Sequence, residues 1–298
     1  MFDNIFSSFF PVGTRRRQFL KSVLIKDSEN PSPVEEFILR KAATPVCKKI
    51  TTREQNELDA LKNCFKGKRC FIIGNGPSLN KCDLSSLQDE FTFGVNGIFY
   101  KTDESGFTPS FYMVEDGHVI DDNLDRINSY EAKFKFFPSI YKNKIEKRDN
   151  TFFFTMDLGF YRKNNRSYGI PRFSENFDTV AYAGQSVTYL NLQLAYYLGF
   201  DTVYLVGMDF HYDIPESAII NGLSIESMDD DPNHFHPEYF GKGKKWHDPK
   251  LDSVAMNYEF AKIKYEQSGR RIFNATYGGN LEIFERVDFD SLMEKAVT

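Results

Sequence analysis

Polar side chains follow several short apolar runs of this chain, at the points where the runs end. Asn75 comes after the run 71–73, and Gly74 and Gly76 beside it allow positive φ angles and close approach of the backbone. Pro77 suits the first turn of a following helix, where backbone N–H groups can hold a phosphate. The same residues are also compatible with a tight turn that binds no ligand. Similar positions along the chain complete a set of candidate ligand-binding residues: Gly74, Asn75, Gly76, Ser78, Asn96, Glu115, Asp116, Gln185, Ser186, Asp209, Asn274 and Thr276.

Four of the five histidines fall in or beside the segment 209–247, which has no clear periodicity: His211, His234, His236 and His247. Histidine is the usual general base near neutral pH, so a histidine beside a cleft is a candidate for deprotonating an acceptor hydroxyl. Two alternatives remain open. One is a loop histidine without a catalytic role, and the other is a zinc site built from His234 and His236 with Asp209 or His247. No HExxH or Cys/His spacing supports the metal, so we favour a single acid/base histidine.

Strand and helix patterns alternate from Lys68 onward, which predicts an α/β fold with a mainly parallel sheet and helices on both faces. In such sheets a ligand lies beyond the carboxyl ends of the strands, so the polar residues named above should converge on one cleft. The expected strands are 69–73, 91–95, 110–114, 134–137, 152–155, 202–206 and 271–274.

Two helices have clear start and stop residues. Ser186 can cap the first, which carries an apolar stripe from Val187 to Tyr197 and stops at Gly199. Its N-terminus could receive a carboxylate or a phosphate, or Ser186 could serve only as the cap. Asp248 and Pro249 open the second, whose apolar stripe 251–265 has helical spacing and ends at Gly269.

The first 66 residues differ from the rest, so we predict an N-terminal helical extension (1–66) and a catalytic-type domain (67–298) with a long lid-like loop (209–247). Phenylalanines and the cluster Arg15 to Arg17 in segment 1–17 suit contact with an anionic membrane surface. The other interpretation of the extension is packing against the main domain or against a second subunit.

Composition indicates a globular protein of the cell interior, either free in the cytoplasm or peripheral on the inner face of the membrane. The net charge of −5 argues against a general nucleic-acid binder, and 41% hydrophobic residues suffice for a core. No run approaches the 18 apolar residues of a membrane span, and the start lacks a secretory signal. The cysteines show no CxxC spacing and predict reduced thiols: Cys47, Cys64, Cys70 and Cys82.

Six short segments together carry a resemblance to known proteins: FIIGNGPSL at 71–79, GVN at 94–96, GQSV at 184–187, LGF at 198–200, YLVGMDF at 204–210 and NHF at 233–235. In this order they resemble bacterial lipooligosaccharide sialyltransferases. They are also similar to the broader superfamily of motility-associated-factor glycosyltransferases and archaeal 6-hydroxymethylpterin pyrophosphokinase-like proteins. The ending 274–281, followed by Phe284, resembles the broader superfamily more than the sialyltransferases. The resemblance covers residues 68 to 288.

This resemblance implies a modified Rossmann-like glycosyltransferase that needs no metal and inverts the anomeric centre of a CMP-activated sugar such as CMP-sialic acid. Asn75 and Asn96 would contact the CMP part of the donor, and Ser186 its carboxylate or phosphate. His234 would be the base, with His236 and His247 as alternatives in the same mechanism. The family's tyrosine that binds the leaving phosphate corresponds to His211 or to Tyr212 beside it.

The implied partners are a nucleotide-sugar donor and a cell-surface glycan or glycolipid acceptor, as in lipopolysaccharide or capsule biosynthesis. Two other functions stay open. The first is a Mg²⁺-dependent pyrophosphokinase of the 6-hydroxymethyl-dihydropterin type, which consumes ATP. The second is a non-catalytic glycan-binding subunit that retains the fold.

Overall fold

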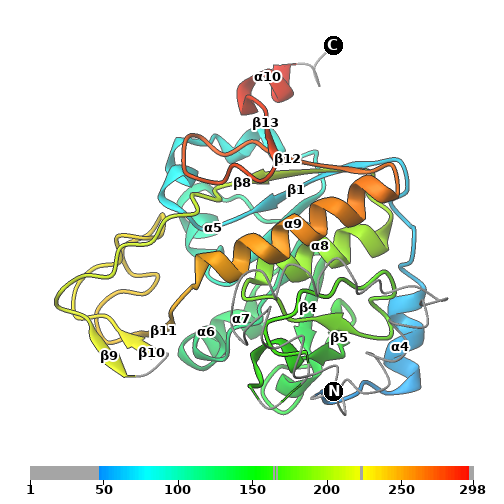
Figure 1. Ribbon diagram of the computed structural model, residues 1–298, viewed down its shortest axis with the longest axis horizontal. Coiled ribbons are helices and arrows are strands. Elements are labelled where there is room, and N and C mark those ends of the chain that lie inside the picture. Colours follow the sequence, from blue (N-terminus) through cyan, green and yellow to red (C-terminus); the bar gives the residue numbers. More distant parts are fainter. Residues whose placement is uncertain (1–46, 164, 166, 222–223, 295–298) are drawn as a thin grey trace, which may run out of the picture.

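An eight-stranded parallel sheet forms the centre of the molecule in the computed structural model, which describes residues 47–163, 165, 167–221 and 224–294 (Figure 1). The strand order is β13-β12-β8-β1-β2-β3-β4-β5, and each neighbouring pair runs parallel. The bounds are β1 Arg69–Ile73, β2 Thr92–Val95, β3 Phe111–Met113, β4 Phe134–Pro138, β5 Thr151–Phe154, β8 Thr202–Val206, β12 Arg271–Asn274 and β13 Glu285–Arg286. The predicted parallel α/β fold and its seven strands are confirmed, and β13 was not expected.

Helices cover both faces of this sheet, because successive side chains of each strand point to opposite sides. On β1, Cys70 and Ile72 join the core beneath α8 (Val187–Leu198) and α9 (Leu251–Gln267), while Phe71 and Ile73 join the core on the other face. That second face carries α5 Phe99–Ser105, α6 Gly117–Asp122, α7 Leu124–Ser129 and α10 Phe289–Glu294, with the 3₁₀ turns Pro77–Lys81 and Leu84–Leu87. Further 3₁₀ turns are Ser139–Tyr141 and Gly159–Tyr161.

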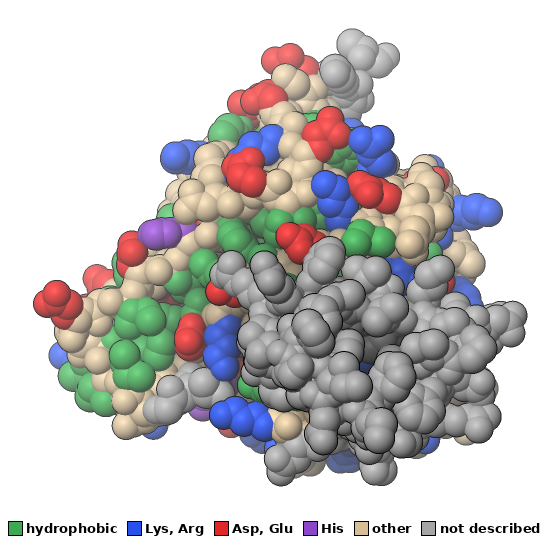
Figure 2. Space-filling view, viewed as in Figure 1, with side chains coloured by type: hydrophobic (Ala, Val, Ile, Leu, Met, Phe, Trp, Pro, Cys, Tyr) green, Lys and Arg blue, Asp and Glu red, His purple; other side chains and the backbone are tan. Residues whose placement is uncertain are grey.

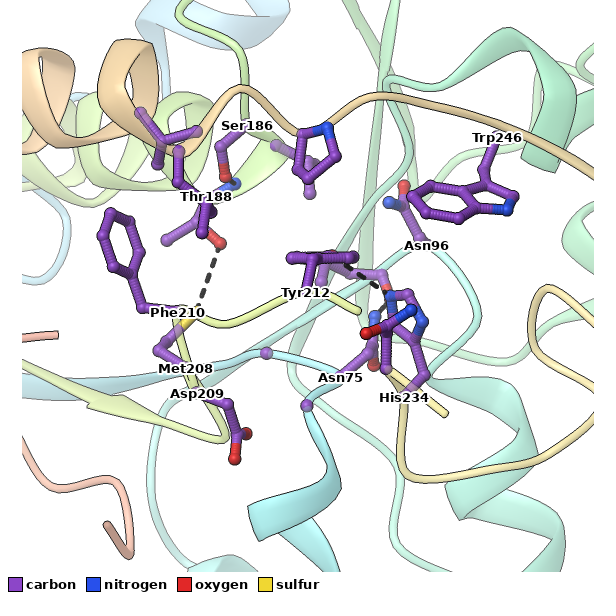
Figure 3. Close-up of a pocket in the computed structure, with 18 of the residues that line it drawn as sticks. Asn75, Asn96, Ser186, Thr188, Met208, Asp209, Phe210, Tyr212, His234 and Trp246 are labelled. Carbon is purple, nitrogen blue, oxygen red and sulfur yellow. Dashed lines mark hydrogen bonds between the residues drawn. The ribbon is translucent and has the colours of Figure 1, made fainter. Parts of the chain in front are cut away.

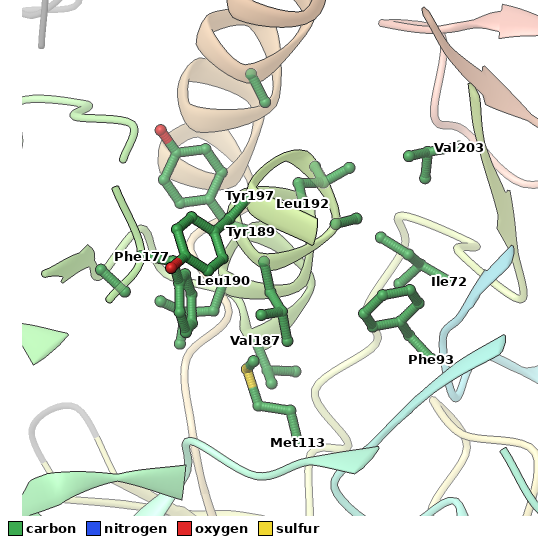
Figure 4. Packing of buried hydrophobic residues seen from close by; sticks show 14 of the residues in the cluster. Ile72, Phe93, Met113, Phe177, Val187, Tyr189, Leu190, Leu192, Tyr197 and Val203 are labelled. Atoms are coloured by element: carbon green, nitrogen blue, oxygen red, sulfur yellow. The ribbon is translucent and has the colours of Figure 1, made fainter. Parts of the chain in front are cut away.

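Helix α8 begins and ends as its sequence predicts, but it is buried almost all round (Figure 4). The Ser186 hydroxyl accepts a hydrogen bond from the Thr188 N–H, and Gly199 closes the helix with a left-handed φ of 94°. The face opposite the sheet is covered by α9 and by the segment that precedes the helix, where the Tyr189 hydroxyl donates to the Arg172 carbonyl. This covering explains why α8 lacks the polar face of a surface helix.

Two smaller sheets lie outside the central one. Strands β6 (Met156–Asp157) and β7 (Ala181–Tyr182) pair in parallel before α8. The predicted lid-like loop contains an antiparallel sheet of β9 (Ile219–Asn221), β10 (Ser224–Glu226) and β11 (Lys245–His247), which projects beside the main body (Figure 1). We call residues 209–247 the insertion. Its outer strand exposes Ile219 and Ile220, which contribute to an apolar patch on its surface (Figure 2).

Residues 47–66, at the end of the predicted N-terminal extension, pack against the same core as the rest. Helix α4 (Thr52–Asp59) lies against β5, Leu58 is buried, and the Phe65 ring stacks on Phe200 at 5.0 Å. Segment 1–17, the predicted membrane contact, lies outside the described residues, so both its role and the boundary at residue 66 stay predictions. All four cysteines are unpaired. None of the helices in the described ranges combines the length and apolar character that crossing a bilayer requires.

Gly74 shows how closely β1 and β8 approach where they end. A Cβ atom on Gly74 would lie 2.5 Å from the Gly207 carbonyl oxygen and 2.7 Å from the Met208 sulfur. We expect Gly74→Ala to lower the free energy of unfolding by about 1–3 kcal/mol, because the obstacle includes backbone that is held in the sheet. Urea unfolding measures this change. Gly117→Ala in α6 is the matched control, and an equal loss in both variants would contradict the explanation.

Candidate functional site

The described residues form a pocket at the carboxyl ends of the central strands, beside the switch point of the sheet (Figure 3). From β1 the chain builds β2 to β5 on one side, and it then returns to place β8 on the other side of β1. Ligands of open α/β sheets bind where the strand order reverses in this way. The turns after β1, β2, β3 and β8, the start of α8 and the insertion all contribute lining residues, so the predicted convergence on one cleft is largely confirmed.

His234 is the most constrained imidazole in this pocket. Its Nδ1 lies 2.7 Å from the Asp231 carboxylate, and its ring stacks on Tyr239 with centroids 4.0 Å apart and planes within 4°. An ionised carboxylate only accepts hydrogen bonds, so Nδ1 carries the proton and Nε2 of the neutral ring is the acceptor. Nε2 lies 3.4 Å from the Tyr212 hydroxyl. This is the arrangement of a general base with a carboxylate that orients it.

Asp231 holds its charge although it is buried. Burial alone would raise the pKa of Asp231, but hydrogen bonds from His234 and from the N–H groups of Asn233 and Phe240 outweigh burial and lower it. The same three bonds fix the carboxylate relative to the imidazole. Asp231 therefore positions His234 and favours one tautomer of its ring.

Aromatic rings from the insertion enclose the base. Tyr212, Tyr239, Phe240 and Trp246 all line the pocket, and Trp246 stacks on Tyr212 at 6.0 Å while its Nε1 donates to Ser227. Burial, and next to it the charge of Asp231, raises the pKa of Tyr212, so its hydroxyl stays protonated and can donate to a ligand oxygen. The insertion therefore supplies the base, its orienting carboxylate and one wall of the pocket.

Asn75 and Asn96 place two unfilled acceptors at the ends of β1 and β2. The Asn75 amide nitrogen donates to the Val95 carbonyl and to the Tyr239 hydroxyl, while its Oδ1 is buried without a partner. The Oδ1 of Asn96 is buried and unpartnered as well. Buried polar atoms nearly always have a partner, so two orphan acceptors in one pocket point to a ligand that brings hydrogen-bond donors.

The turn after β1 is held by protein groups rather than left open for a phosphate. The Gly74 and Gly76 N–H groups donate to the carbonyls of Val206 and Gly207, and the Asp209 carboxylate accepts from the Ser78 N–H and hydroxyl. Asp209 thus occupies the position at this short 3₁₀ turn that an anion would take. Neither Gly74 nor Gly76 adopts the positive φ that glycine allows, but the close approach of the backbone is confirmed, since a Cβ on Gly76 would lie 1.9 Å from the Asp209 carboxylate.

Strained backbone occurs in the pocket at residues other than glycine. Asn96, Gln185 and Phe210 have φ angles of 45°, 68° and 54°, and all three line the pocket. Left-handed backbone at non-glycine residues costs free energy and clusters at functional sites. At the start of α8, the Gln185 N–H donates to the Tyr161 hydroxyl, and the Ser186 hydroxyl caps the helix and contacts Tyr258 at 3.2 Å.

A second imidazole and carboxylate pair lies at the end of β3. His247 Nδ1 is 3.5 Å from Asp116, and hydrogen bonding to Asp116 raises the pKa of His247 although burial opposes it. Burial would raise the pKa of Asp116, but His247 and the His118 N–H lower it. Burial, followed by the neighbouring charge of Asp116, raises the pKa of Glu115 to about 7, although Tyr161 donates to its carboxyl group.

The raised pKa of Glu115 predicts a pH effect on stability. A carboxyl group with a raised pKa binds its proton more tightly in the folded state, so stability falls as pH rises from its ordinary value of 4.5 to about 7. We expect Glu115→Gln to reduce this pH-dependent decrease in the free energy of unfolding, by at most about 3 kcal/mol. Urea unfolding at pH 4.5, 6 and 7.5 measures the effect, with exposed Glu238→Gln as control. Parallel curves for wild type and Glu115→Gln would refute the assignment.

Not every predicted residue reaches the pocket. Ser78 lies outside it on Asp209, and His236 lies outside it, stacked on Tyr100 at 4.4 Å. Asn274 and Thr276 are buried at the end of β12, where Asn274 donates to the Leu281 carbonyl and Thr276 accepts from the Met208 N–H. Their roles as ligand contacts remain untested predictions, as do those of the residues that line the pocket. These lining residues are Gly74, Asn75, Gly76, Asn96, Glu115, Asp116, Gln185, Ser186, Asp209, His211, Tyr212, His234 and His247.

Sequence reasoning missed Asp231, Tyr239 and Trp246. The spacing of Asp231 and His234, three positions apart, was an available signal for a carboxylate paired with the histidine. For the zinc alternative, the described residues hold no group of three or more His, Cys, Asp or Glu side chains that could bind a metal ion.

Comparisons with known proteins locate this chain in a family. No curated protein sequence matches it. A solved structure of the MAf glycosyltransferase from Magnetospirillum magneticum AMB-1 is similar at 13% identity and a TM-score of 0.44 over 84% of this chain. The alignment spans 41% of that longer protein. Residues 46–215, more than half of the chain, match the family described as 6-hydroxymethylpterin diphosphokinase MptE-like. The chain therefore belongs to the MptE-like family.

Proposed function

We propose that this protein is a glycosyltransferase that moves a sugar from a nucleotide donor, with a CMP-sugar favoured, to a hydroxyl of a glycan acceptor. The observation that carries the proposal is the geometry of His234. Its Nε2 faces the pocket as a hydrogen-bond acceptor, because Asp231 binds Nδ1 and Tyr239 holds the plane of the ring. A base fixed in this way is suited to remove the proton of an acceptor hydroxyl.

The transfer is a single displacement with inversion. As His234 takes the acceptor proton, the acceptor oxygen bonds to the anomeric carbon and the bond from that carbon to the donor phosphate breaks. The negative charge that develops on the departing phosphate needs hydrogen-bond donors. The protonated Tyr212 hydroxyl is one donor in the pocket, and we assign it this role.

The unfilled acceptors support a cytidine nucleotide. The free Oδ1 atoms of Asn75 and Asn96 require ligand donors, and cytosine has an exocyclic amino group where uracil has a carbonyl oxygen. Ribose hydroxyls are donors in both nucleotides. We therefore expect CMP to bind more tightly than UMP, and the wall of Tyr239 and Trp246 suits stacking by a base or a sugar.

The test is turnover of CMP-sugars, beginning with CMP-sialic acid, with a panel of oligosaccharides as acceptors and in the presence of a chelator. Release of CMP coupled to formation of an inverted glycoside supports the proposal. Hydrolysis without transfer, or an intact donor with each acceptor, counts against it.

The family match favours a second candidate, because the family's description names a 6-hydroxymethylpterin diphosphokinase. We take this candidate to be Mg²⁺-dependent and to consume ATP. This reaction also begins with deprotonation of a hydroxyl, so His234 would serve as base in both. Conversion of ATP to AMP that requires both Mg²⁺ and the pterin would establish it, whereas metal-independent turnover of a CMP-sugar would exclude it.

A further inference from the structure

The charges around the pocket limit how it can hold a phosphate. Among the described residues that line it there is no lysine or arginine, while four carboxylates do line it: Glu115, Asp116, Asp209 and Asp248. Every nucleotide ligand brings at least one phosphate, which proteins bind through charged donors and backbone N–H groups. The side-chain cations available to such a ligand are therefore the three imidazoles of His211, His234 and His247.

Two of these imidazoles are less suited to bind a phosphate: one is the proposed base, and the other is exposed at the surface. His234 is bound to Asp231, and its Nε2 is the acceptor that the proposed base requires. His211 pairs with Asp213 at 3.2 Å at the surface, where 59% of its side chain is exposed. His247 remains as the imidazole that lines the pocket and can donate to a ligand.

His247 is held with one ring edge free. Its Nδ1 faces Asp116, its ring stacks on His118 with centroids 4.6 Å apart, and no described residue partners its Nε2. Half of its side chain is exposed, so a ligand can reach it. The Gln185 amide donates to the carbonyl of the neighbouring residue Asp248 at 3.4 Å, which ties this strand end to the turn before α8.

The surroundings favour the protonated ring. Hydrogen bonding to Asp116 and, beyond it, the charges of Asp116 and Glu115 raise the pKa of His247. From α6, the titratable ring of His118 stacks on the same imidazole. The raised pKa of Glu115 reduces the negative charge that a phosphate would meet here near neutral pH.

We propose that the His247 imidazole, held by Asp116, binds the phosphate of the nucleotide ligand in place of a lysine or arginine. This inference rests on the proposed use of a nucleotide donor. The unfilled Oδ1 of buried Asn75 in the same pocket is an independent indication that a ligand binds there. The base and the ribose of the nucleotide would contact other residues. Loss of His247 should therefore weaken binding of the nucleotide but not of its nucleoside, which lacks the phosphate.

The test compares CMP with cytidine by isothermal titration calorimetry on wild type, His247→Gln and the control His236→Gln, whose imidazole lies outside the pocket. Hydrogen bonds to charged groups contribute about 1.5–3 kcal/mol, so we expect His247→Gln to weaken CMP binding at least tenfold. Cytidine affinity should stay unchanged, and His236→Gln should behave as wild type. Asp116→Asn, which keeps the imidazole but removes its partner, should give an intermediate loss of CMP affinity.

The pH dependence adds a second readout. A histidine with a raised pKa is protonated at low pH and loses its charge as pH rises through that value. Between pH 7 and 9 the CMP phosphate is already dianionic, since its second pKa is about 6. The preference of wild type for CMP over cytidine should therefore decrease with pH, and the preference of His247→Gln should be low and decrease less, because only the ionisation of Glu115 then remains to weaken it.

Each outcome decides the inference. An equal loss of CMP and cytidine affinity in His247→Gln, or no loss of either, overturns it. The same measurement with ADP against adenosine and UDP against uridine separates it from the choice of donor. If another nucleotide binds in place of CMP and its phosphate affinity depends on His247, the phosphate subsite stands and the CMP-sugar proposal fails. If no nucleotide binds more tightly than its nucleoside, the phosphate subsite is refuted.

Discussion

Replacement of His234 by glutamine is expected to reduce the rate of sugar transfer by about 10²–10⁴-fold. The amide cannot take the acceptor proton, although it fills similar space between Asp231 and Tyr212. Nucleotide affinity should stay near that of wild type, because the base acts on the acceptor. Single-turnover transfer with donor bound to saturation measures the step directly.

The matched control is His236→Gln, two residues away. His236 stacks on Tyr100 outside the pocket, so its replacement should leave the transfer rate within a few-fold of wild type. Full activity in His234→Gln would contradict the assignment of the base. Equal loss in both variants would indicate a general disturbance of the insertion instead.

The second large effect is expected for Asp231→Asn, which should lower the transfer rate by about 10²–10⁴-fold with little change in acceptor KM. The comparison is the buried aspartate of the serine protease triad, whose replacement by asparagine leaves the histidine in the wrong tautomer and costs about 10⁴ in kcat. An asparagine amide can donate to Nδ1 of His234, which would move the proton to Nε2 and remove the acceptor that faces the pocket.

The tautomer itself distinguishes this positioning role from a merely structural one. Nitrogen-15 NMR of histidine-labelled protein should show Nδ1–H at His234 in wild type and Nε2–H in Asp231→Asn. Exposed Asp230→Asn is the control, with no change in tautomer or rate. An unchanged tautomer together with a reduced rate would attribute the loss to the loop that Asp231 also holds through the Asn233 and Phe240 N–H groups.

Much of the central fold could be predicted from the sequence because its signals are local. Strands β1 to β5, β8 and β12 are short, mainly apolar runs, each followed by turn residues, and α8 has its cap at Ser186 and its glycine stop at Gly199. The start of α9 was predicted less accurately, at Asp248 and Pro249. The helix begins at Leu251 after Lys250, which has a φ of 44°, and Asp248 caps the Lys250 N–H before it.

The insertion could not be predicted in the same way, because its strands have three residues each and their order depends on long-range pairing. In β9 both isoleucines are exposed, so an alternating pattern is absent, and β11 pairs with β10 across about twenty intervening residues. Periodicity needs longer segments to become visible. The sheet formed by these strands is nevertheless what places Trp246 and His247 at the pocket.

The candidate site was predicted well where residues follow strands directly and less well where side chains bind one another. Asn75, Asn96 and Glu115 follow their strands into the pocket, as the parallel topology requires. The sequence alone offered no way to foresee that Asp209 would bind Ser78 or that Thr276 would accept from Met208. These contacts depend on how closely β1, β8 and β12 approach one another.

The strand order has a consequence for the way the molecule reaches its native state. β1 pairs with β2 about twenty residues later, but it also pairs with β8, more than 120 residues along the chain. Contacts of such large sequence separation form slowly, because the chain entropy of closing the loop is lost before the pairing compensates for it. Asn75 follows β1 and His234 comes after β8, so the pocket cannot form until these two strands have paired. Ligand binding should therefore be among the last properties to return on refolding, after most helical structure has formed.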